Sequence, residues 1–264
     1  MANKDLTDAA KIIVRNDLEL FVKEIFVLEE QDARQDATFT FFADGYPGVV
    51  YLQSAKGFLL PRMKPLSPFF LYGQMIEPYK LSVRTPYLMI AFQLYPFAAR
   101  LLFDVDPKRL NDDCADLSEM KGVTIDNPLE ALARTSSIDL KTELIANFLS
   151  ELAREKGMEE YPKIQQAIGM IQEHKGLITI HALAKSLDLT ERTLRRKFIR
   201  YVGIPPKKFA KIIQFQASLD QISTGGFSKL TDVVYDNGYA DQSHFIRNIR
   251  RFTAKKPMQL KNLQ

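Results

Sequence analysis

Two groups of polar and basic side chains in the last third of the chain have the chemistry to read DNA bases. The groups are Arg192, Arg195 and Arg196, and then Gln242, Ser243 and Arg247. A guanidinium group donates two hydrogen bonds to guanine O6 and N7, and a glutamine amide pairs with adenine. The basic side chains around these groups suit contacts with phosphates instead: Arg200, Lys207, Lys208, Arg250, Arg251 and Lys256.

An internal repeat places both groups on equivalent elements. Leu183-Ala184 matches Val233-Val234 at an offset of 50 residues. The residues Leu194, Phe198 and Tyr201 match Phe245, Ile249 and Phe252 at an offset of 51, as Pro206 matches Pro257. Each copy reads as a short helix, a tight turn and a longer helix with apolar residues at i, i+4 and i+7. This is the layout of a helix-turn-helix unit.

Two helical hairpins that only build a core are the alternative. The distribution of acidic residues argues against it, because Glu191 and Asp241 are the only acids on the two longer helices and lie in or before their first turns. There they suit the helix dipole and leave the arginine faces uncompensated.

Charge divides the chain into two unlike parts. Residues 1–160 contain 18 Lys and Arg against 25 Asp and Glu, a net charge of −7. Residues 161–264 contain 18 against 7, a net charge of +11. A compact basic part joined to an acidic one indicates that the second part meets a polyanion.

Residues 163–264 resemble the DNA-binding domain of AraC/XylS-family transcription regulators. The resemblance lies in Leu183-Ala184, in residues 189–198 (LTERTLRRKF), in residues 237–247 (NGYADQSHFIR) and in Pro257. It implies a seven-helix module with a long central helix near residues 206–222 and two recognition helices about one turn of DNA apart. By position, the resemblance implies that the residues that contact bases are Arg192, Arg195 and Arg196 in the first unit and Gln242, Ser243 and Arg247 in the second. Two residues depart from the family pattern: Ala254 replaces a usual glycine, and Lys256 replaces a small polar residue.

Local signals set the expected helices of this part. A first helix begins at Lys163, Thr179 and Thr190 N-cap the next two, and Pro205-Pro206 opens the long one. Further helices are expected over residues 229–236 and 241–252 and after Pro257.

The first part of the chain is β-rich. Short apolar runs with aromatic and β-branched residues occupy residues 37–43, 48–53, 69–75 and 86–94, with turn signals between them. They predict a sandwich or partly closed barrel. A helix is expected around residues 97–103, and a loop is expected over residues 104–116. The fold class is therefore a multidomain α+β protein: a β-rich domain with flanking helices, then an all-α domain with two helix-turn-helix units.

Residues 127–156 change to helical periodicity, with one apolar stripe. That stripe fits packing on the domain's own sheet or a contact between two subunits. We place the domain boundary after it, so that residues 1–157 form a sensing or dimerisation domain and residues 158–264 the DNA-binding domain.

The first domain also resembles β-rich sensor domains of unknown specificity attached to some members of the family. The resemblance is carried by Phe42-Ala43-Asp44-Gly45 and by residues 92–99 (FQLYPFAA). It implies a domain that binds a small effector, dimerises or does both. The domain's aromatic residues fit either a core or the wall of a cavity: Phe39, Phe41, Phe42, Tyr51, Phe69, Phe70, Tyr72, Tyr87 and Phe92.

An enzyme and an architectural DNA-binding protein are the competing functions. All three histidines, His174, His181 and His244, lie in the second part, so the first cannot hold a His-ligated metal. Cys114 stands among carboxylates, which are expected to raise its pKa and keep the thiol inert. We therefore predict no enzyme and no cofactor. Defined Gln and Arg positions favour sequence-specific over non-specific binding.

The remaining expectations concern partners and compartment. No apolar run is long enough to span a membrane, no secretion signal opens the chain, and one cysteine fits a reducing compartment. We predict a cytoplasmic regulator that binds double-stranded DNA, with a small effector, a second copy of the chain and RNA polymerase as candidate partners.

Overall fold

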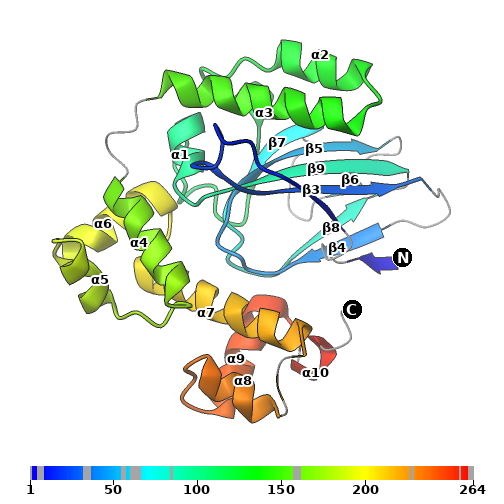
Figure 1. Ribbon diagram of the computed structural model, residues 1–264. Coiled ribbons are helices and arrows are strands. Elements are labelled where there is room, and N and C mark those ends of the chain that lie inside the picture. Colours follow the sequence, from blue (N-terminus) through cyan, green and yellow to red (C-terminus); the bar gives the residue numbers. More distant parts are fainter. Residues whose placement is uncertain are drawn as a thin grey trace.

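Two β-sheets face each other in the N-terminal part of the computed structural model (Figure 1). The structure describes residues 2–4, 9–31, 37–54, 58–59, 67–83, 86–156, 162–225, 227, 229–255 and 257–260. The smaller sheet has the order β1 (Ala2–Lys4), β4 (Ala37–Phe41), β8 (Tyr79–Val83) and β6 (Phe58–Leu59). The larger has the order β10 (Cys114–Asp116), β7 (Phe69–Tyr72), β5 (Gly48–Ser54), β9 (Tyr87–Leu94), β3 (Val22–Glu30) and β2 (Ala10–Ile12).

The central strand β9 shows how the layers are stacked, because all eight of its residues are buried. Tyr87, Met89 and Ala91 point into the core between the sheets, with Phe39 of the smaller sheet. Ile90 and Phe92 belong to a second core on the opposite face. A strand that is apolar on both faces needs cover on both, and helices supply the second cover.

Helices α1 (Ala98–Phe103) and α3 (Ile138–Glu155) cover that outer face, with α2 (Asp126–Arg134) beside α3 (Figure 1). The ring of Phe148 on α3 lies 5.4 Å from that of Phe69 on β7. The apolar stripe predicted over residues 127–156 therefore packs on the domain's own sheet. The structure divides that stretch into two helices, since Ser137 begins α3 by accepting a hydrogen bond from the backbone N–H of Leu140.

Sequence patterns missed part of the larger sheet. The strand β3, which lies between β9 and the edge strand β2, was not predicted, because only residues 25–28 of it form an apolar run between charged residues. The loop expected over residues 104–116 ends in β10. The strand expected over residues 69–75 ends at Tyr72, because the backbone of Gly73 packs directly against that of Leu110.

Seven helices follow within the described residues, as the family resemblance implied. They are α4 (Pro162–Glu173), α5 (Ile180–Ser186), α6 (Glu191–Val202), α7 (Pro206–Ser223), α8 (Leu230–Asp236), α9 (Gln242–Thr253) and α10 (Pro257–Leu260). Thr179 and Thr190 are N-caps, as expected, each accepting a hydrogen bond from the backbone three residues on. The predicted multidomain α+β class is confirmed, while the boundary between residues 157 and 158 falls outside the described residues.

One loop of the first part, residues 43–46, lies against three helices of the second. The amide N–H of Ala43 donates to the carbonyl of Phe252 at the end of α9, and its own carbonyl accepts from Gln216 on α7. Tyr46 is hydrogen-bonded to Gln172 on α4. The apolar core continues across this contact between the two parts.

A second contact joins the parts at the end of α6. Gly203 adopts a left-handed conformation with φ 86°, and a Cβ there would lie 2.7 Å from the backbone of Pro107. The side-chain amide of Asn111 donates to the Gly203 carbonyl at 3.1 Å. The carboxyl ends of α6 and α9 therefore both rest on the first part of the chain. No helix in the described part is both long and apolar enough to cross a bilayer.

Candidate nucleic-acid interface and pocket

Helix α6 turns an apolar face inward and an arginine face outward. Leu194, Phe198 and Tyr201 are buried, as predicted. The three residues predicted to read bases from this helix, Arg192, Arg195 and Arg196, are all exposed. An amphipathic helix with its apolar stripe in the core must present the remaining positions to solvent.

Helix α9 repeats this arrangement. Its N-cap Asp241 accepts a hydrogen bond from the amide of His244 at 2.7 Å. Phe245, Ile249 and Phe252 are buried, while the predicted readers Gln242, Ser243 and Arg247 are exposed. The helix ends at Ala254, whose φ of 56° is the left-handed conformation that glycine adopts most easily. Ala254 therefore ends the helix in the conformation that the family's usual glycine would favour.

The long helix α7 holds the two units together (Figure 1). The ring of Phe209, in its first turn, lies 5.9 Å from that of Phe198 on α6. The ring of Phe215 lies 5.0 Å from that of Phe252 on α9. With 18 residues and a rise of 1.5 Å per residue, α7 is about 27 Å long. Both recognition-type helices are thus fixed to one rigid element.

The outward faces are basic and largely uncompensated. Among the residues that the structure describes, no carboxylate forms an ion pair with the predicted base-reading arginines Arg192, Arg195, Arg196 and Arg247. Glu191 pairs instead with His181, whose Nδ1 lies 3.2 Å from a carboxylate oxygen and whose side chain is 80% exposed. His244 packs its ring edge-to-face against Tyr239.

The six predicted phosphate-contacting residues fall into different environments. Arg200, Lys207, Arg250 and Arg251 are exposed. Lys208 is half-buried; burial lowers its pKa, the nearby Arg251 lowers it further, and Asp112 and Glu77 of the first part act in the opposite direction. Lys256 lies outside the described residues. Lys207 is therefore the clearest of the lysines for a contact with DNA.

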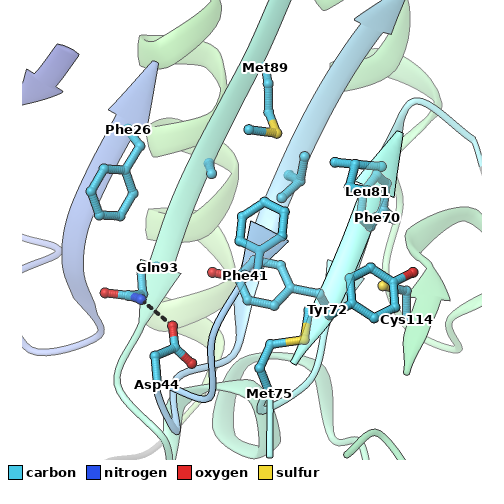
Figure 2. Close-up of a pocket in the computed structure, with 13 residues that line it drawn as sticks. Phe26, Phe41, Asp44, Phe70, Tyr72, Met75, Leu81, Met89, Gln93 and Cys114 are labelled. Carbon is cyan, nitrogen blue, oxygen red and sulfur yellow. Dashed lines mark hydrogen bonds between the residues drawn. The ribbon is translucent and has the colours of Figure 1, made fainter. Parts of the chain in front are cut away.

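A cavity of about 60 Å³ lies between the two sheets (Figure 2). Of the nine aromatic residues that fitted either a core or a cavity wall, Phe41, Phe70 and Tyr72 line it. The other lining residues are Phe26, Asp44, Val50, Met75, Tyr79, Leu81, Met89, Ala91, Gln93 and Cys114. The buried Phe39, Tyr51, Phe69, Tyr87 and Phe92 are core residues outside this lining.

Strand register explains where the cavity forms. Tyr72, Gly48 and Gln93 lie in one row across β7, β5 and β9. Gly48 has no side chain, and a Cβ there would lie 2.5 Å from the Tyr72 ring. The tyrosine ring therefore lies across Gly48. Because Gly48 has no side chain, this row of residues leaves space that a larger residue at position 48 would fill.

Asp44 is the acidic group of this cavity. One of its carboxylate oxygens accepts from the amide of Tyr46 at 3.0 Å, and the other accepts from Gln93 Nε2 at 2.7 Å (Figure 2). Burial raises the pKa of Asp44 to about 6, although these hydrogen bonds and the charge of Lys23 oppose the rise. The residue belongs to the segment Phe42-Ala43-Asp44-Gly45, which carries part of the resemblance to sensor domains. Its partner Gln93 is a polar residue near the end of an otherwise apolar strand, and this is the sequence signal by which the pair could have been found.

Cys114 also lines the cavity. Burial is the main cause that raises the pKa of its thiol to about 12, and the charge of Asp113 adds to it. The predicted direction is confirmed, while the main cause is burial rather than the carboxylates. Among the described residues, no group of three His, Cys, Asp or Glu side chains could hold a metal ion.

Comparisons with protein families match both parts of the chain. A helix-turn-helix domain of the AraC type matches residues 183–262, and a domain of unknown function (DUF6597) matches residues 11–116. No curated protein matches the chain.

Solved structures similar to the chain include two of ToxT and one of AraT. ToxT from Vibrio cholerae is 13% identical over 92% of this chain and 98% of its own, with a TM-score of 0.49. ToxT with an unsaturated fatty acid bound is 12% identical over 89% and 93%, with a TM-score of 0.48. The C-terminal domain of AraT, a response regulator from Geobacillus stearothermophilus, is 18% identical over 39% and 86%, with a TM-score of 0.36.

The matched helix-turn-helix domain contains the internal repeat, both recognition-type helices and their exposed arginines. The chain therefore carries a helix-turn-helix DNA-binding domain of the AraC type, which follows a β-rich N-terminal domain of unknown function.

Proposed function

We propose that the protein recognises a specific DNA sequence by placing α6 and α9 in successive major grooves on one face of the duplex. The observation that carries the proposal is that both helices bury an apolar stripe against one frame, α7, and expose Arg or Gln side chains on the other side. Successive major grooves are about 34 Å apart, and a frame about 27 Å long with a helix at each side suits that spacing.

Base reading is assigned to Arg192, Arg195 and Arg196 of α6 and to Gln242, Ser243 and Arg247 of α9. These residues occupy the first turns and middle of each helix, and a helix-turn-helix unit contacts base edges with the N-terminal part of its second helix. Phosphate contacts are assigned to Arg200, Lys207, Arg250 and Arg251, with Lys208 and Lys256 as further candidates.

The test begins with selection of a preferred duplex from a random library. Binding of that duplex and of a scrambled one is then measured by fluorescence anisotropy at two salt concentrations. Sequence-specific binding predicts a large ratio of affinities at both. A ratio of affinities near one at both salt concentrations would support the competing hypothesis, an architectural protein that binds through phosphates alone.

Two single variants then separate the roles. Arg196→Ala is expected to lose about 1–3 kcal/mol of discrimination at one base pair. Lys207→Ala is expected to weaken all duplexes alike and to reduce the salt slope by about 1. If Arg196→Ala behaved like Lys207→Ala, its assignment as a base reader would be wrong.

We further propose that the first domain controls DNA binding through a small effector. Support comes from the loop of residues 43–46, in which Asp44 lines the cavity while its neighbours are bound to α4, α7 and α9. A ligand that moves Asp44 would move a segment on which a recognition helix ends. The carboxyl ends of α6 and α9 both rest on this domain, so their relative placement depends on it.

A homodimer, a contact with RNA polymerase and a cytoplasmic location stay predictions. The oligomeric state is measured by sedimentation of the full chain with and without DNA. A dimer would bind duplexes with paired half-sites more tightly than duplexes with one.

A further inference from the structure

The cavity between the two sheets is lined mainly by apolar groups, with the hydroxyls of Tyr72 and Tyr79 and the thiol of Cys114 among them. Phe26, Phe41 and Phe70 form part of its wall, with Met75 and Met89 nearby (Figure 2). Thioether side chains are flexible and polarisable, so they adapt to different ligand shapes. The polar end consists of Asp44 and Gln93.

A single lining group carries charge at neutral pH. Of the thirteen lining residues, Asp44, Tyr72, Tyr79 and Cys114 can lose a proton. Burial raises the pKa values of both tyrosines and of the thiol, so these three groups stay neutral. Asp44 is mostly ionised at pH 7.5, since its pKa is about 6. The cavity therefore presents one negative charge.

The carboxylate of Asp44 has room for a further partner. Its two oxygens offer about four acceptor positions, and the hydrogen bonds from the Tyr46 amide, from Gln93 and from the amide of Asp44 itself use three of them. Lys23, whose charge acts on Asp44, does not line the cavity. Its Nζ donates to Gln93 Oε1 at 3.2 Å and lies 4.2 Å from the centre of the Tyr46 ring.

The aromatic wall matches the same ligand chemistry. The faces of aromatic rings carry negative potential, so they attract organic cations and repel anions. A carboxylate at one end adds a charge-assisted hydrogen bond to an ammonium group. A carboxylate ligand would instead face both a like charge and the negative ring faces.

We propose that this cavity binds a small organic cation, an amine with an apolar substituent, whose ammonium group bonds to Asp44. The inference rests on the proposed effector control and names the ligand class of that site. The space of about 60 Å³ compares with about 10–15 Å³ for one water, which suits a ligand of about five non-hydrogen atoms.

The test is isothermal titration of the full chain without DNA, in phosphate buffer at pH 7.5, with three probes of matched shape: isobutylamine, isobutanol and isobutyrate. We expect the amine to bind at least about tenfold more tightly than the alcohol, and isobutyrate not to bind. Equal binding of amine and alcohol, tightest binding of isobutyrate, or no binding of any probe would overturn the proposal.

Variants locate the interaction. Asp44→Asn is expected to weaken amine binding about tenfold or more and to leave isobutanol binding unchanged. Glu130→Gln, which removes an exposed carboxylate on α2, is the matched control and should bind like the parent. Ala91→Leu fills the cavity without changing its charge, so it should abolish amine binding even if Asp44→Asn folds poorly. Unchanged amine binding in Asp44→Asn or Ala91→Leu would contradict the site.

Anisotropy with the selected duplex separates this inference from the proposed function. If the amine binds and DNA affinity does not change, the ligand site is supported and effector control is overturned. If no amine binds while the duplex is still recognised, the ligand site is overturned and DNA recognition stands.

Discussion

Single residues with an unfavourable backbone conformation or a buried charge lower the free energy of unfolding of this protein. Ala254 and Asp44 are the two clearest cases. Ala254 ends α9 with φ 56°, and Asp44 holds a carboxylate in a largely apolar cavity. Each predicts a measurable effect that does not depend on DNA.

Ala254→Gly should stabilise the protein. The left-handed conformation costs a non-glycine residue about 1–2 kcal/mol, which glycine avoids. Glycine also increases the conformational entropy of the unfolded chain, and this offsets part of the stabilisation. We expect a net rise of about 0.5–1 kcal/mol in the free energy of unfolding, measured by urea denaturation. Ala153→Gly, inside α3, is the opposite control and should lower it by about 1 kcal/mol.

Asp44 should make stability depend on pH. Its pKa is raised from 3.8 unfolded to about 6 folded, mainly by burial and despite the opposing charge of Lys23. Between these values the folded state binds more protons, so the stability contributed by this group is present at low pH and is lost as pH rises through 6.

Relative to the parent, Asp44→Asn should therefore gain about 1 kcal/mol of stability between pH 5 and pH 8. The measurement is urea denaturation of both proteins across this range. A difference that stays constant with pH would show that Asp44 does not titrate there.

In each of the two recognition-type helices, one face stabilises the fold and the opposite face is available to bind DNA. The inward residues of α9 attach it to α7, and the outward ones are free of ion pairs to carboxylates among the described residues. Substitutions on the two faces should consequently affect different measurements.

Phe245→Ala should cost about 3–5 kcal/mol of stability, because the side chain is fully buried. Arg247→Ala, two residues further along α9 and exposed, should change the free energy of unfolding by less than about 0.5 kcal/mol while relaxing specificity at one base pair. Denaturation and anisotropy on the same preparations test both. A large loss of stability in Arg247→Ala would argue for a structural role.

At the scale of the whole molecule, the loop of residues 43–46 connects the two parts of the chain. Gly45 has φ 77°, and a Cβ there would lie 3.0 Å from the Phe209 ring on α7. Gly122 has φ 74° but no atom within 4 Å of such a Cβ. The two glycines thus share one backbone conformation and differ in their contact.

Gly122→Ala should lower stability by about 1–2 kcal/mol through backbone strain alone. Gly45→Ala should cost more than that and should also increase hydrogen exchange in α7, because the added methyl group presses on Phe209. If the two variants behaved alike in denaturation and exchange, the contact between loop and α7 would be too weak to transmit a signal.

The recognition elements could be predicted from the amino-acid sequence, because the signals that form them are local. Thr190 and Asp241 cap their helices, Leu194 and Phe245 open equivalent apolar stripes, and the arginines necessarily fall on the other face. A repeat at an offset of 50 residues then identified the second unit from the first.

The larger sheet, the cavity and the contact between the two parts depend on tertiary packing and could not be predicted from local patterns. The strand β3 is recognisable through its pairing with β9, at residues 57 to 72 positions away. The cavity needs Tyr72, Gly48 and Gln93 in one row, and register between strands is not written in any single strand. The position of Asp44 between the cavity and α7 likewise depends on how distant segments pack, which no local pattern records.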